Sequence, residues 1–373
     1  MKTITNVKIF DGVSFREESA VTFSDGVILS LNNRADGENL HGLLLCPGFV
    51  DIHMHGIKGL DSMRAGDIAK MSQTEVQYGV TAYCPTSITE TAERTQSYLA
   101  DIRAAMACNR GARILGAHLE GPFLAESVRG IHDINKLKDP KISTFRDLTR
   151  GNEDLVMRVT LAPERHGGME LVKYLSDRGV CVSIGHSVAT SMETSMAIGL
   201  GVTSSTHTFN GMETLHHRKP GVLGVILTDP NICAEFIADL VHIDPIVIRL
   251  IYQSKGPSSC FFCTDSMEAA GMPDGEYFLG REHILVESGV AQKNGKLAGS
   301  TLTMDQGLRN LVFNVGIPLP HAIQMGTQTP ADLIRRTDLG RIRPGAKADF
   351  VVLDQALNVI ATFVRGICEY RAD

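Results

Sequence analysis

The stretch LLLCPGFVDIHMH (residues 43–55) decides the fold of this chain. Its apolar run predicts a buried strand, and His53 and His55 come at the end of that strand. Side chains two residues apart in a strand point to the same face. Two imidazoles are therefore expected side by side at the carboxyl end of a strand, where they can hold a metal ion.

Seven more apolar runs follow, and segments with helical spacing, such as residues 66–79, 91–107 and 168–179, lie between them. The runs are GVTAYCPT (79–86), ARILGAHLEG (112–121), MRVTLAPE (157–164), VCVSIGHS (180–187), SSTHTFN (204–210), CAEFIADLVH (233–242) and SCFFCTDS (259–266). Strand–helix alternation repeated eight times favours a (β/α)₈ TIM barrel, an α/β fold, over a doubly wound open sheet. A barrel also gathers the carboxyl ends of its strands around one mouth.

Both ends of the chain have a different pattern. Short β-type runs separated by Asp-Gly turns at 11–12 and 25–26 occupy the first 45 residues, and similar runs occupy the last 30 or so. We expect residues 1–46 and 337–373 to form a small β-sandwich domain beside a barrel of residues 47–336.

The composition limits the kinds of partner that the protein is expected to bind. The 373 residues carry a net charge of −6, with no basic tract and no apolar run long enough to span a bilayer, so neither nucleic acid nor a membrane is an expected partner. The N-terminus is too polar for a signal peptide, and the eight cysteines show no framework pattern, which predicts reduced thiols in the cytoplasm. Cys260 and Cys263 form a lone CxxC on an apolar strand, which indicates core residues rather than a redox or zinc site.

Polar residues end nearly every predicted strand. They are His53, His55, His118, Glu120, His186, His207, His242 and Asp265. Burying so many imidazoles and carboxylates without a cation would be costly, so the pattern predicts a divalent metal site. Nitrogen and carboxylate ligands without thiolates suit Zn²⁺, with Fe²⁺, Mn²⁺ or Co²⁺ as alternatives. Such an ion lowers the pKa of a bound water to about 7, and a nearby Asp265 could take its proton, which predicts hydrolysis.

Several motifs resemble those of a known family. They are HLEGPF (118–123), LAPE (161–164), GHS (185–187), THTFNGM (206–212), HHRKPG (216–221), TDSMEAAGMPDG (264–275) and LAGSTLTM (297–304). With the strand-end ligands, they resemble the amidohydrolase superfamily and, within it, the N-acetylglucosamine-6-phosphate deacetylase family. The resemblance extends over nearly the whole chain.

The resemblance implies a role for each matching residue. Glu120, His186 and His207 would hold the main metal ion, and His53 and His55 would add a second with Glu120 as the bridge, giving one or two ions per subunit. Asp265 would be the general base and acid, and His132 would lie near the acetamide carbonyl. The residues implied in binding the sugar phosphate are Ile131, His132, Asn210, Gly211, Arg218, His242, Leu297, Ala298 and Gly299. Arg218 would reach the site of a neighbouring subunit, which implies a homodimer.

Some alternatives stay open at this stage. Leu240 stands at a position where the family usually has glycine, and its side chain could narrow the sugar pocket or point away from it. N-acetylgalactosamine 6-phosphate, the epimer of N-acetylglucosamine 6-phosphate, could be hydrolysed by the same residues. Another amidohydrolase activity on a non-phosphorylated amide, or a binding protein without catalysis, would show no acetate release from hexosamine 6-phosphates.

Overall fold

A barrel of parallel strands forms the centre of the molecule. The computed structural model describes residues 1–107 and 110–372. Within these residues the eight barrel strands are β7 (Phe49–Met54), β10 (Val80–Ser87), β12 (Ala117–Glu120), β13 (Val156–Leu161), β14 (Cys181–Ile184), β15 (Val202–Ser205), β16 (Cys233–Ile237) and β17 (Cys260–Cys263). They pair in chain order, the short β11 (Arg113–Ile114) adds to β10, and the Asp265 N–H closes the ring by donating to the His53 carbonyl at 2.9 Å. The barrel prediction is confirmed, and the doubly wound sheet is not observed.

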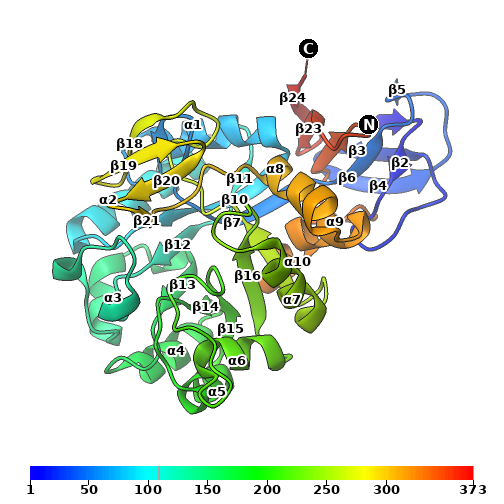
Figure 1. Ribbon diagram of the computed structural model, residues 1–373. Coiled ribbons are helices and arrows are strands. Elements are labelled where there is room, and N and C mark those ends of the chain that lie inside the picture. Colours follow the sequence, from blue (N-terminus) through cyan, green and yellow to red (C-terminus); the bar gives the residue numbers. More distant parts are fainter. Residues whose placement is uncertain (108–109, 373) are drawn as a thin grey trace.

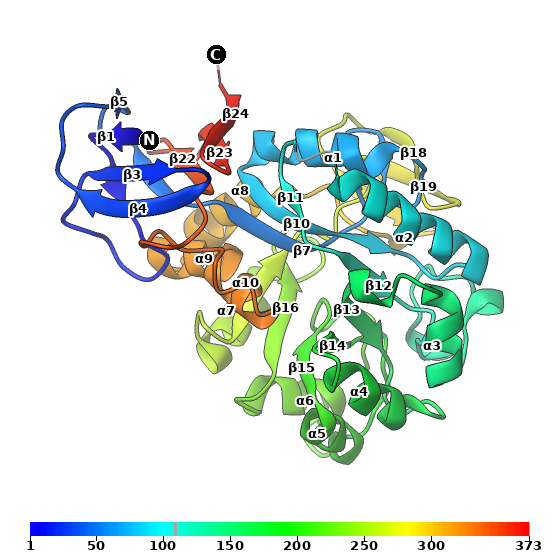
Figure 2. The ribbon, with the colours of Figure 1, turned by 180° about the vertical axis from the view of Figure 1, so that it is seen from behind.

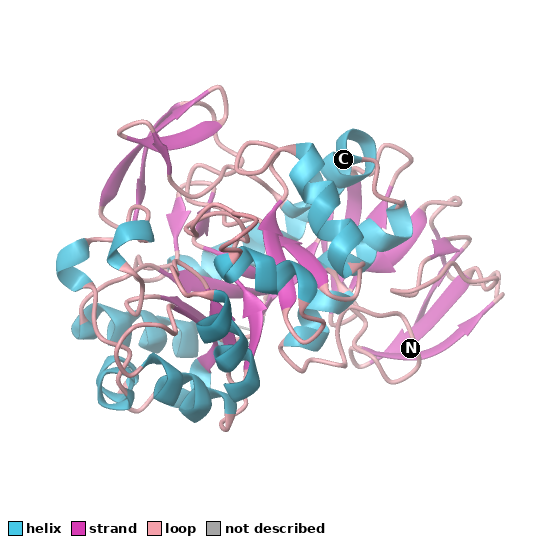
Figure 3. Ribbon diagram, turned by 60° about the horizontal axis from the view of Figure 1, so that its bottom comes forward, coloured by secondary structure: helices cyan, strands magenta, loops and turns pink. Residues whose placement is uncertain are grey.

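Helices alternate with these strands and cover the outside of the barrel (Figures 1 and 3). Between the strands lie α1 (Asp67–Glu75), α2 (Ala92–Met106), α3 (Ile142–Thr149), α4 (Gly168–Ser176), α5 (Ser191–Leu200), α6 (Gly221–Thr228) and α7 (Pro245–Lys255). After β17 come α8 (Met304–Arg309), α9 (Leu319–Gly326) and α10 (Gln328–Leu333), and Asn310–Val315 continues α8 as a π-helix. The helical patterns of residues 66–79, 91–107 and 168–179 are therefore confirmed as α1, α2 and α4.

The first predicted strand serves two sheets. It divides into β6 (Leu44–Pro47), which belongs to a terminal sheet, and β7, which belongs to the barrel. Gly48 separates them, and a β-carbon there would lie 2.0 Å from Thr81 Cγ2. Only glycine lets the chain pass this close to β10, so one apolar run changes sheets without a loop.

Two small sheets unite the ends of the chain (Figures 1 and 2). One has the order β4-β3-β1-β5 and the other β2-β6-β22-β23-β24. Their strands are β1 (Lys2–Thr5), β2 (Lys8–Ile9), β3 (Ala20–Ser24), β4 (Val27–Asn32), β5 (Glu38–Asn39), β22 (Phe350–Leu353), β23 (Val359–Val364) and β24 (Ile367–Arg371), together with β6. The expected β-sandwich is confirmed, and we propose residues 1–46 with 337–373 as that domain and residues 47–336 as the barrel domain.

A further antiparallel sheet was not predicted. It contains β18 (Gly275–Leu279), β19 (Glu282–Glu287), β20 (Val290–Lys293) and β21 (Lys296–Leu297), and it lies beside α1 in Figure 1. The turns Ser288-Gly289 and Asn294-Gly295 have positive φ at both residues, so an Asn-Gly signal was present in the sequence. A two-stranded pair, β8 (Gly56–Ile57) and β9 (Leu60–Asp61), follows the first barrel strand.

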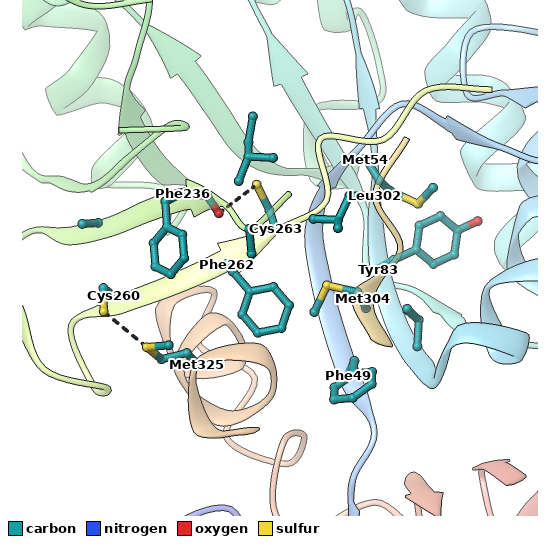
Figure 4. Packing of buried hydrophobic residues seen from close by; sticks show 14 of the residues in the cluster. Phe49, Met54, Tyr83, Phe236, Cys260, Phe262, Cys263, Leu302, Met304 and Met325 are labelled. Carbon is teal, nitrogen blue, oxygen red and sulfur yellow. Dashed lines mark hydrogen bonds between the residues drawn. The ribbon is translucent and has the colours of Figure 1, made fainter. Parts of the chain in front are cut away.

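The CxxC segment lies in the core, as the sequence predicts. Figure 4 shows Cys260 and Phe262 of β17 beside Met325 of α9, with Cys260 Sγ 3.5 Å from Met325 Sδ. Burial raises the pKa of the Cys260 thiol to about 12, so it stays protonated and unreactive at neutral pH. The seven cysteines among the described residues are all free. In the same part of the chain, no helix is both long and apolar enough to cross a bilayer.

Candidate metal centre and active site

A cavity of about 330 Å³ opens at the carboxyl ends of the barrel strands. The sequence-predicted residues that line it are His55, Glu120, Ile131, His132, His186, His207, Asn210, Gly211, His242, Asp265, Leu297, Ala298 and Gly299. The β18–β21 sheet contributes Leu279 and Leu297 to the same wall. Parallel strands that end at one rim thus bring together residues more than 200 positions apart in the sequence.

Three site residues have strained backbone. The φ angle is 47° at His186, 31° at His207 and 48° at Asp265, all in the left-handed region that residues other than glycine avoid. Each of these residues lies two positions after the last residue of its barrel strand. Strain of this kind costs about 1–3 kcal/mol per residue and concentrates at functional sites. These three turns therefore mark the rim as the functional end of the barrel.

Glu120, His186 and His207 form the first group of converging donors. Glu120 Oε1 lies 3.2 Å from His186 Nε2 and 3.1 Å from His207 Nε2, and the two Nε2 atoms lie 3.1 Å apart. Donors bound at 2.0–2.1 Å around a tetrahedral zinc ion would be separated by about 3.3 Å. The three side chains are therefore close enough to share one ion.

His53, His55 and Asp265 form a second group beside the first. Asp265 Oδ1 lies 3.3 Å from His53 Nε2 and 3.1 Å from His55 Nε2. Glu120 Oε2 lies 3.3 Å from His55 Nε2 and 3.7 Å from His53 Nε2, so this carboxylate borders both groups. His53 Nε2 is buried without a hydrogen-bond partner. A buried ring nitrogen without a hydrogen-bond partner fits a position where a metal ion would bind.

Hydrogen bonds at the far side of each ring fix the tautomers of the four histidines. Nδ1 faces the carbonyl of Val128 in His186 at 2.8 Å, that of Asn210 in His207 at 3.0 Å and that of Thr86 in His55 at 3.2 Å. In His53 it lies 2.9 Å from Glu235 Oε1. Because these partners are acceptors, each Nδ1 carries a proton, and Nε2 is the atom of each ring that faces the centre and can bind a metal ion once it is deprotonated. The Nε2 atoms of His186 and His207 lie 3.1 Å apart beside the Glu120 carboxylate, so the donor set fits a divalent metal.

His132 has the opposite tautomer. Its Nδ1 accepts a hydrogen bond from the Thr89 backbone N–H at 3.1 Å, so the proton of the neutral ring is on Nε2. Burial lowers the pKa of this imidazole, which keeps the ring neutral near pH 7. Its Nε2 lies 3.6 Å from Glu120 Oε2 at the edge of the cavity. His132 is therefore built to donate a hydrogen bond rather than to bind a metal.

The carboxylates of the centre are ionised. Burial alone would raise the pKa of Glu120 and of Asp265. The charge of His53 and hydrogen bonds from neighbouring imidazoles outweigh burial, so the pKa of Glu120 lies well below its ordinary value and that of Asp265 lies below its own. In return, although burial opposes protonation, Asp265 and Glu120 raise the pKa of His55 to about 9. A divalent ion bound here would displace the proton from the His55 ring.

The comparisons with known proteins agree with this geometry. The model of the Amidohydrolase family matches residues 44–368, which span the barrel and most of the C-terminal strands. The chain belongs to the amidohydrolase family. It is therefore a metal-dependent hydrolase that acts on an amide, and the family resemblance inferred from the sequence motifs is confirmed.

Three related proteins narrow the branch of the amidohydrolases. The N-acetylglucosamine-6-phosphate deacetylase of Lysinibacillus sphaericus is 33% identical over 378 residues, covering 97% of this chain and 96% of that protein. The N-acetylgalactosamine-6-phosphate deacetylase of Escherichia coli O157:H7 is 34% identical, covering 94% of each. The solved structure of a mutant N-acetyl-D-glucosamine-6-phosphate deacetylase of Mycobacterium smegmatis, in complex with N-acetyl-D-glucosamine-6-phosphate, superposes with a TM-score of 0.93 at 30% identity, covering 99% of each chain.

Two sequence-predicted residues lie elsewhere. Arg218 is exposed on a loop, where its Nη1 lies 2.8 Å from His217 Nε2, and it does not line the cavity within one chain. His118, one of the polar strand ends, faces the barrel interior, where Nδ1 and Nε2 contact the hydroxyls of Thr86 and Thr160 at 3.2 and 2.8 Å. Burial lowers its pKa well below the ordinary value, so it is a neutral packing residue rather than a ligand.

Leu240 points away from the site. It has φ of 65°, packs against the hydrophobic core and is absent from the cavity wall. Of the two orientations that the sequence left open, the structure therefore supports the second. Its neighbour His242 does line the cavity, with Nδ1 held at 2.6 Å by Asp239 Oδ2.

Sequence reasoning missed the floor of the site in this amidohydrolase. Glu235 of β16 and Arg158 of β13 are both fully buried and form an ion pair inside the barrel. Burial raises the pKa of Glu235, but Arg158 and His53 outweigh it and hold that pKa at about 2, so the carboxyl is ionised. The only signal in the sequence was a charged residue near the start of each apolar run, MRVTLAPE and CAEFIADLVH.

Proposed function

We propose that the protein hydrolyses the acetamide of N-acetyl-D-glucosamine 6-phosphate to D-glucosamine 6-phosphate and acetate, a reaction of amino-sugar catabolism. The observation that carries this proposal is the convergence of Glu120, His186 and His207 next to Asp265 at the cavity wall. The deacetylase relatives in several organisms, and the sugar phosphate bound in the Mycobacterium smegmatis structure, support the substrate class.

Glu120, His186 and His207 would hold the main ion, and His53 and His55 would add a second. We propose Zn²⁺, because the donors are imidazole nitrogens and carboxylate oxygens without thiolates, with Fe²⁺, Mn²⁺ or Co²⁺ as competitors. When bound, the metal polarises the amide carbonyl and makes a water molecule more acidic. The remaining tasks of the reaction belong to side chains of this chain.

Asp265 is the proposed general base and acid. Its carboxylate is ionised and lies at the cavity wall, so it can accept a proton from the attacking water. It can then deliver that proton to the amide nitrogen as the C–N bond breaks, which releases acetate and the free amine. One residue would thereby serve both proton transfers.

His132 and the polar residues around it would orient the substrate. With its proton on Nε2, His132 can donate to the acetamide oxygen as negative charge develops there. Asn210 Nδ2 is buried at the cavity without a hydrogen-bond partner, so it is free to donate to a sugar or phosphate oxygen. The Asp239 carboxylate raises the pKa of His242 against the effect of burial, which favours the cationic ring that a phosphate prefers. Ile131, Gly211, Leu297, Ala298 and Gly299 would complete the wall.

We further propose a homodimer in which Arg218 enters the neighbouring site to bind the phosphate bidentately. Arg218 is exposed and does not line its own cavity, and Leu215, Val241 and Ile246 are exposed apolar side chains in the segments that follow β15 and β16. Mixing Asp265→Asn chains with Arg218→Gln chains tests this. In a mixed dimer, the site of the Arg218→Gln chain keeps its own Asp265 and receives Arg218 from the other chain, so this one site should regain activity. A mixture as inactive as its components would contradict the exchange of Arg218.

The galactosamine epimer remains the second candidate, because the Escherichia coli relative that acts on it by name is as similar as the others. Acetate release should be measured with both hexosamine 6-phosphates and with unphosphorylated N-acetylglucosamine, and the metal content should be determined on the same sample. We expect the gluco epimer to have the highest kcat/KM. Release only from the unphosphorylated sugar, or from none of the three, would overturn the proposal. We also propose a cytoplasmic location, in keeping with the free cysteines.

A further inference from the structure

The ion pair inside the barrel has no role in the reaction proposed above. Glu235 Oε2 accepts from Arg158 Nη1, and both side chains are completely buried. Arg158 is held in turn by Ser183 Oγ at 2.9 Å, Ser204 Oγ at 3.3 Å and the Ser205 carbonyl at 3.2 Å. A buried ion pair is weak evidence for stability, because apolar residues of similar volume often stabilise as well or better. Its presence in the centre of a barrel therefore calls for another explanation.

The second oxygen of Glu235 faces the metal centre. Glu235 Oε1 accepts from His53 Nδ1 at 2.9 Å and from the His207 backbone N–H at 2.9 Å. It thus fixes the tautomer of His53 and directs the orphaned Nε2 of that ring toward Asp265 and Glu120. His55, His186 and His207 have backbone carbonyls in the equivalent place, so among these four imidazoles His53 alone depends on a charged side chain.

We propose that Glu235, itself held by Arg158, is a positioning residue for the second metal position, the one that His53 and His55 form. The inference rests on the proposed function, which assigns these two histidines to an ion. A carboxylate behind a ligating imidazole fixes the orientation of the ring and raises its basicity, and loss of such a partner typically lowers metal affinity about 10–100-fold. The first position should be affected less, since the side chains of His186 and His207 keep their carbonyl partners.

The Arg158→Met/Glu235→Leu double variant separates positioning from stability. It replaces the ion pair by apolar side chains of similar size. Leucine cannot accept from His53 Nδ1 or from the His207 backbone N–H, so the melting temperature should fall, and the ion affinities are compared on folded protein. The apoprotein of each form would be titrated with Zn²⁺ by calorimetry, and the ions per subunit counted by elemental analysis after desalting. We expect the wild type to bind two ions, and the double variant to bind the first with little change and the second about 10–100-fold more weakly.

Two further variants complete the test. Glu235→Gln keeps an acceptor for His53 but removes the charge, so the second affinity should fall less than in the double variant; it decides the matter if the double variant does not fold. Glu75→Gln is the matched control, because Glu75 is a buried carboxyl on α1 that does not line the cavity, and it should leave both affinities unchanged.

The outcomes distinguish this inference from the function on which it rests. If folded Glu235 variants bind two ions with wild-type affinities, or if the wild type binds only one ion at any concentration, the positioning role is wrong. Acetate release by the wild type in either case would leave the deacetylase proposal intact. A wild-type protein that binds no metal and releases no acetate would overturn both.

Discussion

The barrel interior and the sandwich core are equally buried but chemically opposite. Between the terminal sheets the packed side chains are apolar, with Ile4, Val21 and Phe23 facing Phe350 and Phe363. Beneath the barrel mouth the chain buries His53, His118, Arg158 and Glu235 together with a series of serine and threonine hydroxyls. Burial of apolar area stabilises a protein by about 25 cal/mol per Å², whereas a buried charge must be fully paired to avoid a cost.

This contrast indicates a division of labour between the two regions. The sandwich core stabilises the fold and has no part in the chemistry, while the barrel interior holds polar groups that serve the site. Substitutions in the sandwich should therefore lower stability without changing turnover, and substitutions at the barrel mouth should lower turnover with little change in stability.

Asp265→Asn should have the largest effect on turnover with the smallest effect on stability. Asparagine has the same shape but cannot accept and return a proton, so kcat should fall about 10³–10⁴-fold. Metal content and melting temperature should stay close to those of the wild type. Acetate release, elemental analysis and thermal unfolding measure the three quantities. Asp177→Asn, on the exposed end of α4, is the control and should behave as the wild type. Near-normal turnover in Asp265→Asn would refute its role in proton transfer.

The opposite case is Phe350→Ala in the sandwich core. The Phe350 ring is fully buried, with the ring of Phe23 edge-on at 5.6 Å and that of Phe363 at 6.4 Å. Loss of a buried phenylalanine typically costs about 3–5 kcal/mol, so the melting temperature should fall by several degrees. The kcat of the folded fraction should not change. Phe313→Ala, at an exposed phenylalanine, should leave both quantities unchanged. A large loss of kcat in folded Phe350→Ala would break the proposed division.

The residues at the rim of the site could be predicted from the sequence because a polar residue ends nearly every apolar run. His53 and His55 share a face by strand periodicity, and Glu120, His186 and Asp265 each close an apolar run. Once the runs are placed in a barrel, their convergence follows from the fold alone. The resemblance to deacetylases supplied the assignments that spacing could not, such as that of His132.

The interior could not be predicted in the same way. Arg158 and Glu235 are 77 positions apart, and nothing local distinguishes a charge that pairs inside a barrel from one that faces solvent. The tautomer of each histidine depends on a distant carbonyl, such as that of Val128 behind His186. For Arg218, the proposed place in a site depends on a second copy of the chain, which a single sequence does not describe.

His242 tests a pH-dependent contact at the same rim. Its pKa in the folded protein is raised by Asp239, so the cationic ring is present below that pKa and is lost as the pH rises through it. If the ring binds the substrate phosphate, KM should be lowest at low pH and rise with pH. His242→Gln should raise KM about 10-fold at low pH, about 1.4 kcal/mol of binding, and converge with the wild type at high pH. His166→Gln, at an exposed histidine, should keep the wild-type profile, and a flat wild-type profile would contradict the contact.

Substitutions at Leu240 should have the smallest effects, because its backbone is strained but its side chain does not line the cavity. Its left-handed φ of 65° disfavours any residue with a β-carbon, whereas glycine adopts it without cost. Leu240→Gly and Leu240→Ala both remove the packed side chain, so the difference in their free energies of unfolding isolates the strain. We expect the glycine variant to be more stable than the alanine variant by about 1 kcal/mol.

At Ala100, exposed within helix α2, the same exchange should have the opposite sign, since glycine in a helix interior costs about 1 kcal/mol. Both Leu240 variants should retain wild-type kcat/KM, because this side chain does not contact the cavity. An alanine variant as stable as the glycine variant would mean that the backbone at the rim is free to relax, and the strain at His186, His207 and Asp265 would then need the same test.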